Sequence, residues 1–250
     1  TPMLGEAARA LLAHGLAQQN VEFIVRSAIG FVIDTYVTDI AASRLLLAKL
    51  FTRERLNRFG HEEVPTICYK IAAIGAADPE FVTVIYRVVF DYEVTEDRQT
   101  QLGQSRILNL TSNTRQDYNG ARWSPGAYLP QFLDYQPRAA VKAVVAALDG
   151  YLRRVHPVSE GALDVQLNIS GRPIRLREDH SYIWAHNPDD QYDSDAESLV
   201  PKLRTRLRDA SEPDAAILAD LLIKECTSAI FWSRLFLCAV ERGDSLLDRV

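Results

Sequence analysis

The sequence predicts a mainly α-helical protein, built from antiparallel helical pairs like an α-solenoid, with one β-hairpin at about residues 163–176. Apolar residues recur at helical spacing through most of the 250 residues. The segments with this spacing are about 12–20 residues long and are joined by short connections, as in stacked helical pairs. Strand-like alternation is strong in a single place. A hydrophobic content of 47% with 24% charged residues is typical of a globular protein.

Residues 1–93 are expected to form the N-terminal helical pairs. The first two helices are marked by apolar stripes, which include Leu4, Ala8, Leu11, Leu12 and Leu16 in the first and Val21, Ile24, Val25, Ala28 and Ile29 in the second. A longer helix is expected from Tyr36 to about Phe59. Three arginines stand near its predicted end, where positive charge is favourable. These are Arg53, Arg55 and Arg58.

Two prolines mark the next helix starts. Pro65 suits the first turn of one helix, because that position needs no backbone N–H donor. Asp78 and Pro79 combine an N-cap residue with a first-turn proline. The helix that they begin is expected to end near Asp91.

Residues 94–155 are expected to form a polar loop followed by helices that continue the array. The helical pattern breaks from about residue 94 to residue 130, apart from a short helix expected around residues 117–122. Helical spacing then returns in two segments. These are residues 128–133 and 137–152.

Residues 156–250 are expected to contain the hairpin, an acidic loop and the closing helices. Apolar residues alternate on both sides of Ser170-Gly171, which is a hairpin signature. The acidic loop covers residues 187–197. Three helices follow, at about residues 196–208, 214–225 and 227–242. The three parts are expected to form one continuous unit cut from a larger protein.

The common catalytic and cofactor motifs are missing from the sequence. It contains no phosphate-binding G-x-x-x-x-G-K-[ST] or G-x-G-x-x-G, no H-E-x-x-H and no G-x-S-x-G. Cys68, Cys226 and Cys238 form no C-x-x-C pair and are expected to be buried, reduced thiols. No apolar run reaches the roughly 18 residues of a membrane span. We therefore expect a cytoplasmic segment with no catalytic residue, cofactor or metal ion of its own.

Two other classes of function remain open from the residues. A metal-dependent hydrolase could bring together Asp91, Glu93 and the acidic residues of 189–195. A nucleic-acid-binding module could use Arg204 and Arg208, which lie one helical turn apart. The formal net charge of −5 gives no general attraction to nucleic acid.

The polar stretch Arg106–Trp123 is the main candidate for an interaction site, because recognition residues often lie on loops held by a rigid scaffold. Its candidate residues are Arg106, Asn113, Arg115, Asp117 and Tyr118. A structural role is the favoured alternative. In that case Asp117 and one of the arginines face inward, and Asp117→Ala lowers the melting temperature. The apolar residues expected to hold the stretch against the core are Ile107, Leu108, Leu110, Tyr118 and Trp123.

Two longer stretches resemble a known family. They are "SRILNLTSNTRQDYNGARWSPGAYLPQFLDYQPRAAVKAVVAALDGYL" and "VPKLRTRLRD…LADLLIKECTSAIFWSRLFLCAV". Both are similar to the helical region, outside the nucleotide-binding domain, of large bacterial NTPases of the STAND type. The resemblance covers about Ser105 to Val240. It implies a piece of a defence-related or signalling ATPase, in which such regions sense a target, hold a switch closed or mediate assembly.

The function expected from these observations is that of a non-catalytic helical scaffold or sensor segment of a larger bacterial protein. Its partners would be proteins or other domains of the same chain, and oligomers could form through the parent protein. Any ATP-dependent activity would belong to another part of that protein, since no nucleotide motif lies in this chain.

Overall fold

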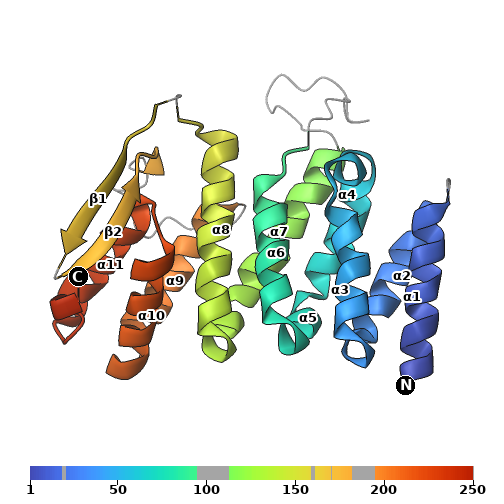
Figure 1. Cartoon of the computed structure of the whole chain (residues 1–250), viewed down its shortest axis with the longest axis horizontal. Coiled ribbons are helices and arrows are strands. Elements are labelled where there is room, and N and C mark those ends of the chain that lie inside the picture. Colours follow the sequence, from blue (N-terminus) through green and yellow to red (C-terminus); the bar gives the residue numbers. More distant parts are fainter. Residues whose placement is uncertain (19–20, 95–112, 159–160, 170, 182–194, 250) are drawn as a thin grey trace. The chain divides into compact units, whose positions relative to one another are not determined.

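The computed structural model describes residues 1–18, 21–94, 113–158, 161–169, 171–181 and 195–249. These residues form eleven α-helices and one antiparallel hairpin, which confirms a mainly α fold with a single β-hairpin (Figure 1). The chain divides into two compact units, Thr1–Pro125 and Gly126–Val250. The division predicted at residues 93 and 155, and the α-solenoid arrangement, stay predictions.

The first unit begins with two helices close to the predicted ones and ends within a long helix. Its elements are α1 (Pro2–Ala17), α2 (Glu22–Asp34), η1 (Tyr36–Thr38), α3 (Ile40–Ala48), η2 (Lys49–Phe51), α4 (Arg53–Tyr69), α5 (Ile71–Ala77), α6 (Pro79–Asp91) and the first part of α7 (Asn113–Tyr135). The prediction that Asp78 and Pro79 begin α6 is confirmed, since the Asp78 side chain accepts a hydrogen bond from the Phe81 amide.

The single helix predicted from Tyr36 to Phe59 is wrong. Asp39 is extended and its side chain accepts a hydrogen bond from the Ala42 amide, so a new helix begins there. Thr52 is extended as well and separates η2 from α4. The arginines at positions 53, 55 and 58 therefore lie in the first turns of α4 and not at a helix end.

The predicted start at Pro65 is also wrong, because this proline lies inside α4. A proline there removes one backbone hydrogen bond of the helix. Val64, Ile67 and Cys68 beside it are fully buried. Their packing stabilises the helical path through the proline.

The polar interval predicted to extend to residue 130 is too long, since α7 begins at Asn113. Helical spacing is present in this segment. The residues that carry it are Tyr118, Ala121, Arg122, Leu129 and Phe132, all of them buried. Polar neighbours and two prolines, at positions 125 and 130, hide the pattern in the sequence.

The second unit contains the hairpin and the closing helices near their predicted positions. After the end of α7 its elements are α8 (Pro137–Val155), β1 (Asp164–Ile169), β2 (Arg172–Arg177), η4 (Ala196–Ser198), α9 (Leu199–Asp209), α10 (Glu212–Glu225), α11 (Ala229–Arg242) and η5 (Leu247–Arg249).

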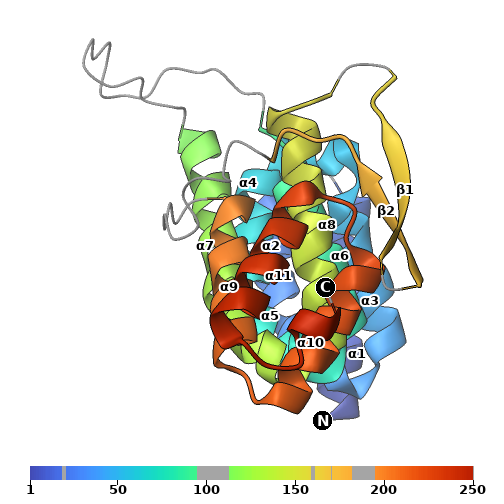
Figure 2. The same cartoon turned by 90° about the vertical axis from the view of Figure 1, so that its left-hand side faces the viewer.

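The hairpin rests on the helices of the second unit through β2. Leu167 pairs with Ile174 and Val165 with Leu176, so these four side chains share one face of the sheet. Ile174 is buried, whereas Val165 and Leu167 on β1 are exposed. Figures 1 and 2 both show β2 between β1 and these helices.

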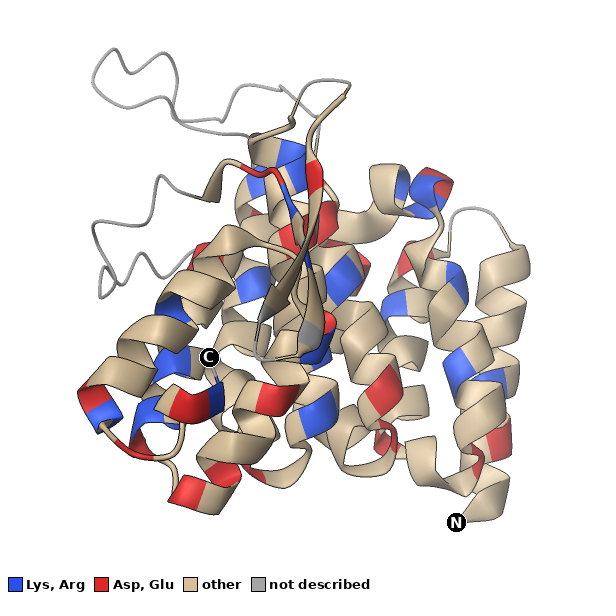
Figure 3. Cartoon of the chain, turned by 60° about the vertical axis from the view of Figure 1, so that its left-hand side comes forward, with Lys and Arg blue, Asp and Glu red and all other residues tan. Residues whose placement is uncertain are grey.

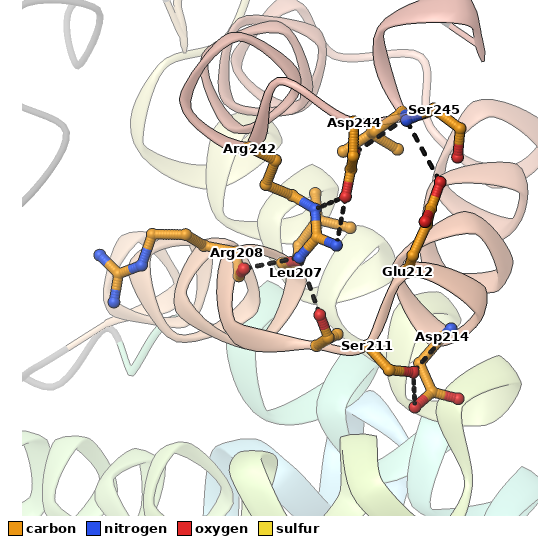
Figure 4. A network of polar contacts seen from close by, with 10 residues as sticks. Leu207, Arg208, Ser211, Glu212, Asp214, Arg242, Asp244 and Ser245 are labelled. Carbon is orange, nitrogen blue, oxygen red and sulfur yellow. Dashed lines mark hydrogen bonds and ion pairs between the residues drawn. The ribbon is translucent and has the colours of Figure 1, made fainter.

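An arginine from α11 closes the C-terminal end of α9. Nη1 of Arg242 donates to the carbonyl oxygens of Leu207, Arg208 and Ala210 at 3.2, 2.6 and 2.8 Å (Figure 4). Asp244 holds the guanidinium in place from the other side, at 2.6 Å from Nη2. The last carbonyls of a helix lack partners within the helix, and here a neighbouring helix supplies them.

A buried carboxylate connects three elements of the first unit. Asp78 is 2% exposed. It accepts hydrogen bonds from the Tyr36 hydroxyl at 2.8 Å, from Arg44 Nε at 2.6 Å and from the Phe81 amide at 3.0 Å. Burial alone raises the pKa of this carboxyl, but the hydrogen bonds from Arg44, Tyr36 and Phe81 outweigh burial, and the pKa lies below its usual value.

We expect Asp78→Ala to lower the free energy of unfolding by about 3 kcal/mol, because it leaves a buried hydroxyl and a backbone N–H without an acceptor. Asp39→Ala is the matched control, since Asp39 also caps a helix but is exposed. That change should cost about 1 kcal/mol. Urea denaturation measures both, and equal losses would contradict the role given to Asp78.

The contribution of Asp78 should depend on pH. A carboxyl whose pKa is lowered on folding stabilises the protein above its unfolded pKa, and this stabilisation is lost as the pH falls through the folded pKa. The difference in unfolding free energy between the unaltered chain and Asp78→Ala should therefore be constant near neutral pH. It should shrink once the pH falls below 3.8, the pKa of an aspartate carboxyl that is exposed to solvent. A difference that grows on acidification would refute this coupling.

Candidate functional site

The helix α1 packs against its neighbours through small residues. A Cβ atom added to Gly5 would lie 1.9 Å from Oγ1 of Thr38 in η1, and one added to Gly15 would lie 2.9 Å from Cγ2 of Val25 in α2. Arg9 also donates to the Thr38 hydroxyl at 2.9 Å. The buried positions of α1 are Gly5, Ala8, Leu12 and Gly15. The backbone of α1 therefore lies close to η1 and α2.

Three large apolar residues of α1 lie on its exposed side. Met3 is 74% exposed and Leu4 57%, and Leu11 is exposed as well. With Ala7 and Ala10 they occupy positions three, four and seven apart, which place them on one side of the helix. We call these five residues the apolar face of α1. Figure 1 shows α1 as the outermost helix of its unit.

This arrangement corrects part of the prediction for the first helix. The predicted stripe contains Leu4 and Leu11 together with Ala8 and Leu12. Ala8 and Leu12 are buried, but Leu4 and Leu11 face solvent. The close approach at Gly5 and Gly15 sets which side of α1 meets α2 and η1, and Leu4 and Leu11 fall outside that contact.

Exposed apolar residues continue on the elements that follow α1. Phe23 of α2 is 83% exposed. Of the 21 large apolar side chains found exposed among the described residues, nine lie in the first 45 positions: Met3, Leu4, Leu11, Phe23, Ile24, Phe31, Val37, Ile40 and Leu45. Single exposed apolar residues are normal on protein surfaces, and only the side chains on α1 are shown here to share one side of an element.

The candidate residues of the polar stretch are not all placed as predicted. Arg106 and the side chain of Asn113 lie outside the described residues. Tyr118 is buried, and its hydroxyl donates to the Val89 carbonyl at 3.4 Å. Arg115 faces inward and donates from Nε to the Val94 carbonyl at 3.0 Å.

Two expectations for this stretch are wrong. Asp117 is exposed on α7 and does not face inward. Trp123 is 62% exposed, although it was expected to hold the stretch against the core. Both follow from the helical geometry of α7, because its buried side is set by Tyr118, Ala121 and Arg122. Ile107, Leu108 and Leu110 lie outside the described residues.

Arg122 has the role that was expected of Asp117, and the sequence reasoning missed it. This buried arginine donates to the carbonyl oxygens of Val89 at 3.2 Å and Tyr92 at 2.8 Å, and to the side chain of Asn119 at 3.0 Å. It closes the C-terminal end of α6. Its position one turn after Tyr118 is the signal that could have identified it, had α7 been recognised as a helix.

The arginines proposed to contact nucleic acid are paired with carboxylates. Arg204 of α9 lies 2.5 Å from Glu241 of α11, and Arg208 lies 2.8 Å from its neighbour Asp209. Acidic and basic residues are interspersed over the described helices (Figure 3). Over these described helices the arrangement offers no large basic surface of the kind that phosphate backbones require.

The carboxylates proposed for a metal-dependent hydrolase each have a different local environment. Asp91 is exposed at the end of α6, and Glu93 lies 3.7 Å from Arg115. Asp195 forms an ion pair with Arg154 at 2.6 Å, whereas the rest of residues 189–195 falls outside the described part. Within the described residues, no three His, Cys, Asp or Glu side chains are placed to hold a metal ion.

The three cysteines are buried as predicted, and none forms a disulfide. Burial raises the pKa of all three thiols, to about 12 in Cys226. Thiols with raised pKa values are poor nucleophiles near neutral pH.

Comparison with protein-family models, curated proteins and solved structures found no match for this chain. None of the described helices combines the length and the apolar character needed to cross a membrane. The candidate site therefore rests on the geometry of the chain itself.

We expect Arg122→Gln to lower the free energy of unfolding by about 2 kcal/mol, because two helix-end carbonyls lose a charged donor in a buried place. Asp117→Ala, on the exposed side of the same helix, should change stability by no more than about 0.5 kcal/mol. Urea denaturation of both variants tests the assignment. A larger loss for Asp117→Ala than for Arg122→Gln would restore the original expectation.

Proposed function

We propose that this chain is a non-catalytic helical scaffold segment that mediates protein–protein or intramolecular contacts through the apolar face of α1. The observation that carries the proposal is the distribution of residue sizes on this helix. Its smallest residues, Gly5 and Gly15, face the protein, while Met3, Leu4 and Leu11 face solvent. A helix of this kind leaves a part of its apolar area available to a second surface.

The partner that fits this face is an amphipathic α-helix. The five residues of the face repeat at the spacing by which one helix packs against another. None of the five is charged, so a second apolar stripe can cover them without burying an unpaired ion. Complete burial of side chains such as Met and Leu contributes about 1.5–3 kcal/mol each.

The resemblance to STAND-type NTPases supports the same function. Helical regions of those proteins sense targets or mediate assembly, and a helix-binding face serves either task. We place this scaffold in a cytoplasmic, defence- or signalling-related bacterial protein on that resemblance. The nucleic-acid alternative is less well supported, because Arg204 and Arg208 both have carboxylate partners.

Site-specific photo-crosslinking in the protein as it is naturally produced tests the proposal. A photoreactive amino acid at Leu11 should cross-link to a helix with an apolar stripe. Leu4→Glu should reduce the yield about tenfold, since it places a charge in the contact at a cost of more than 1.4 kcal/mol. Because Leu4 is exposed, the variant should keep its melting temperature.

Ala13 is the matched control, since it is exposed on another side of the same helix. A photoreactive group there should give little product. Equal yields at positions 11 and 13, or products with nucleic acid in place of protein, would overturn the proposal.

A further inference from the structure

The hairpin of the second unit has one edge that is open to a further strand. Within the described residues β1 pairs with β2 alone, in a regular antiparallel register from Asp164–Arg177 to Ile169–Arg172. Figures 1 and 2 show β1 on the side of the hairpin that faces away from the helices. An edge strand presents unpaired backbone groups, and a sheet of two strands gains stability when further strands are added.

The register of the hairpin shows which backbone groups of β1 point away from β2. The amide of Glu178 donates to the Leu163 carbonyl at 2.8 Å, so these two residues form a hydrogen-bonded pair. In an antiparallel ladder such pairs alternate with pairs whose backbone groups point outward. The N–H and C=O groups of Asp164, Gln166 and Asn168 therefore point outward, and they have no partner among the described residues.

The edge of β2 is protected, in contrast to that of β1. Its outward amide at Arg177 already donates to the Thr227 carbonyl at 3.1 Å. Pro173 stands opposite Asn168 and so occupies another outward position, where a proline has no N–H to offer. Prolines, lysines and bulges are common protections of exposed edges, and β1 contains none of them. The open edge of the hairpin is therefore that of β1.

The side chains of β1 suit contact with a further strand. Val165 is 42% exposed and Leu167 40%, although Ile174 on the same face of β2 is buried. The single charged residue of β1 is Asp164, whose carboxylate accepts a hydrogen bond from Arg175 Nε at 2.9 Å. A strand added at this edge would cover apolar side chains and would meet a carboxylate that already has its counter-ion.

We propose that two copies of this chain associate by pairing their β1 strands, antiparallel about a two-fold axis at Gln166, to form a four-stranded sheet. This register uses all three outward-pointing residues of each copy. Gln166 pairs with Gln166 of the second copy, and Asp164 pairs with Asn168. Val165 then lies opposite Leu167 on each side of the axis.

A second copy fits this edge because the edge is complementary to itself in that register. Each aspartate faces an amide side chain, so no like charges lie opposite one another. Each valine faces a leucine in a pair without mutual backbone hydrogen bonds, where side chains approach most closely. Pairing occupies both edges, so the assembly closes as a dimer. A strand of six residues gives a small interface, and we expect a reversible dimer.

Sedimentation equilibrium of the whole chain, at physiological ionic strength, tests this inference. The mass should rise with protein concentration from 28.1 kDa towards twice that value. Gln166→Pro should weaken the association about tenfold or more, because each copy loses an outward N–H at the centre of the contact. The hairpin does not use this N–H, so the melting temperature should stay unchanged. Gln166→Thr keeps the N–H and is the matched control, which should still dimerise.

Disulfide cross-linking tests the register. The native cysteines are buried and should not interfere. Gln166→Cys should form a covalent dimer under mild oxidation, because paired Cα atoms about 5.5 Å apart suit a disulfide. Asn168→Cys is the control on the same edge. Its two copies would lie about 13 Å apart, which is too far for a disulfide.

The proposal is overturned if the chain stays monomeric at every concentration, whether or not the edge of β1 binds some other extended peptide. Equal dimerisation of Gln166→Pro and Gln166→Thr, or equal cross-linking at positions 166 and 168, would also overturn it. The inference does not rest on the apolar face of α1, so Leu4→Glu should leave dimerisation unchanged. A dimer lost in Leu4→Glu and kept in Gln166→Pro would assign self-association to α1 and exclude the strand pairing.

Discussion

The carboxylate of Asp78 fixes the arrangement on which the first unit depends. A buried charge must have partners, and Asp78 takes them from η1, α3 and the start of α6. Tyr36 and Arg44 are thereby held at set positions relative to α6. Two residues after Tyr36, Thr38 contacts Gly5 and Arg9 of α1. The orientation of α1 is thus linked to Asp78 through η1, although α1 itself makes no contact with Asp78 that is described here.

Arginine has a recurring structural task in this protein, which is to close the ends of neighbouring helices. Arg122 does so for α6 and Arg242 for α9, each through its donors to several carbonyl oxygens. A guanidinium group suits this task because it offers five donors in a fixed plane and always carries a positive charge. Some of the arginines in the sequence therefore serve helix termination, and Arg204 and Arg208 pair with carboxylates.

The parts of the structure that could be predicted are those set by local signals. Three features depend on short stretches of sequence. They are the helix start at Asp78-Pro79, the hairpin turn at Gly171 with its positive φ of 80°, and the three closing helices. Where tertiary packing outweighs local preference, the prediction was wrong. Pro65 lies inside a helix because its neighbours are buried, and α7 runs through two prolines for the same reason. The apolar face of α1 could not be predicted, because it depends on which side of the helix meets residues distant in the sequence.

The exposed apolar face of α1 also ties the solution behaviour of this chain to its charge. At neutral pH a net charge of −5 makes the molecules repel one another, which opposes contact between their apolar faces. The calculated isoelectric point is about 5.6, so this repulsion vanishes after a modest fall in pH. Added salt acts in the same direction, because the distance over which charges act falls to about 8 Å at physiological ionic strength. If the proposed function holds, colloidal stability and partner binding depend on the same few side chains, so a change that improves solubility at this face would also remove the proposed contact.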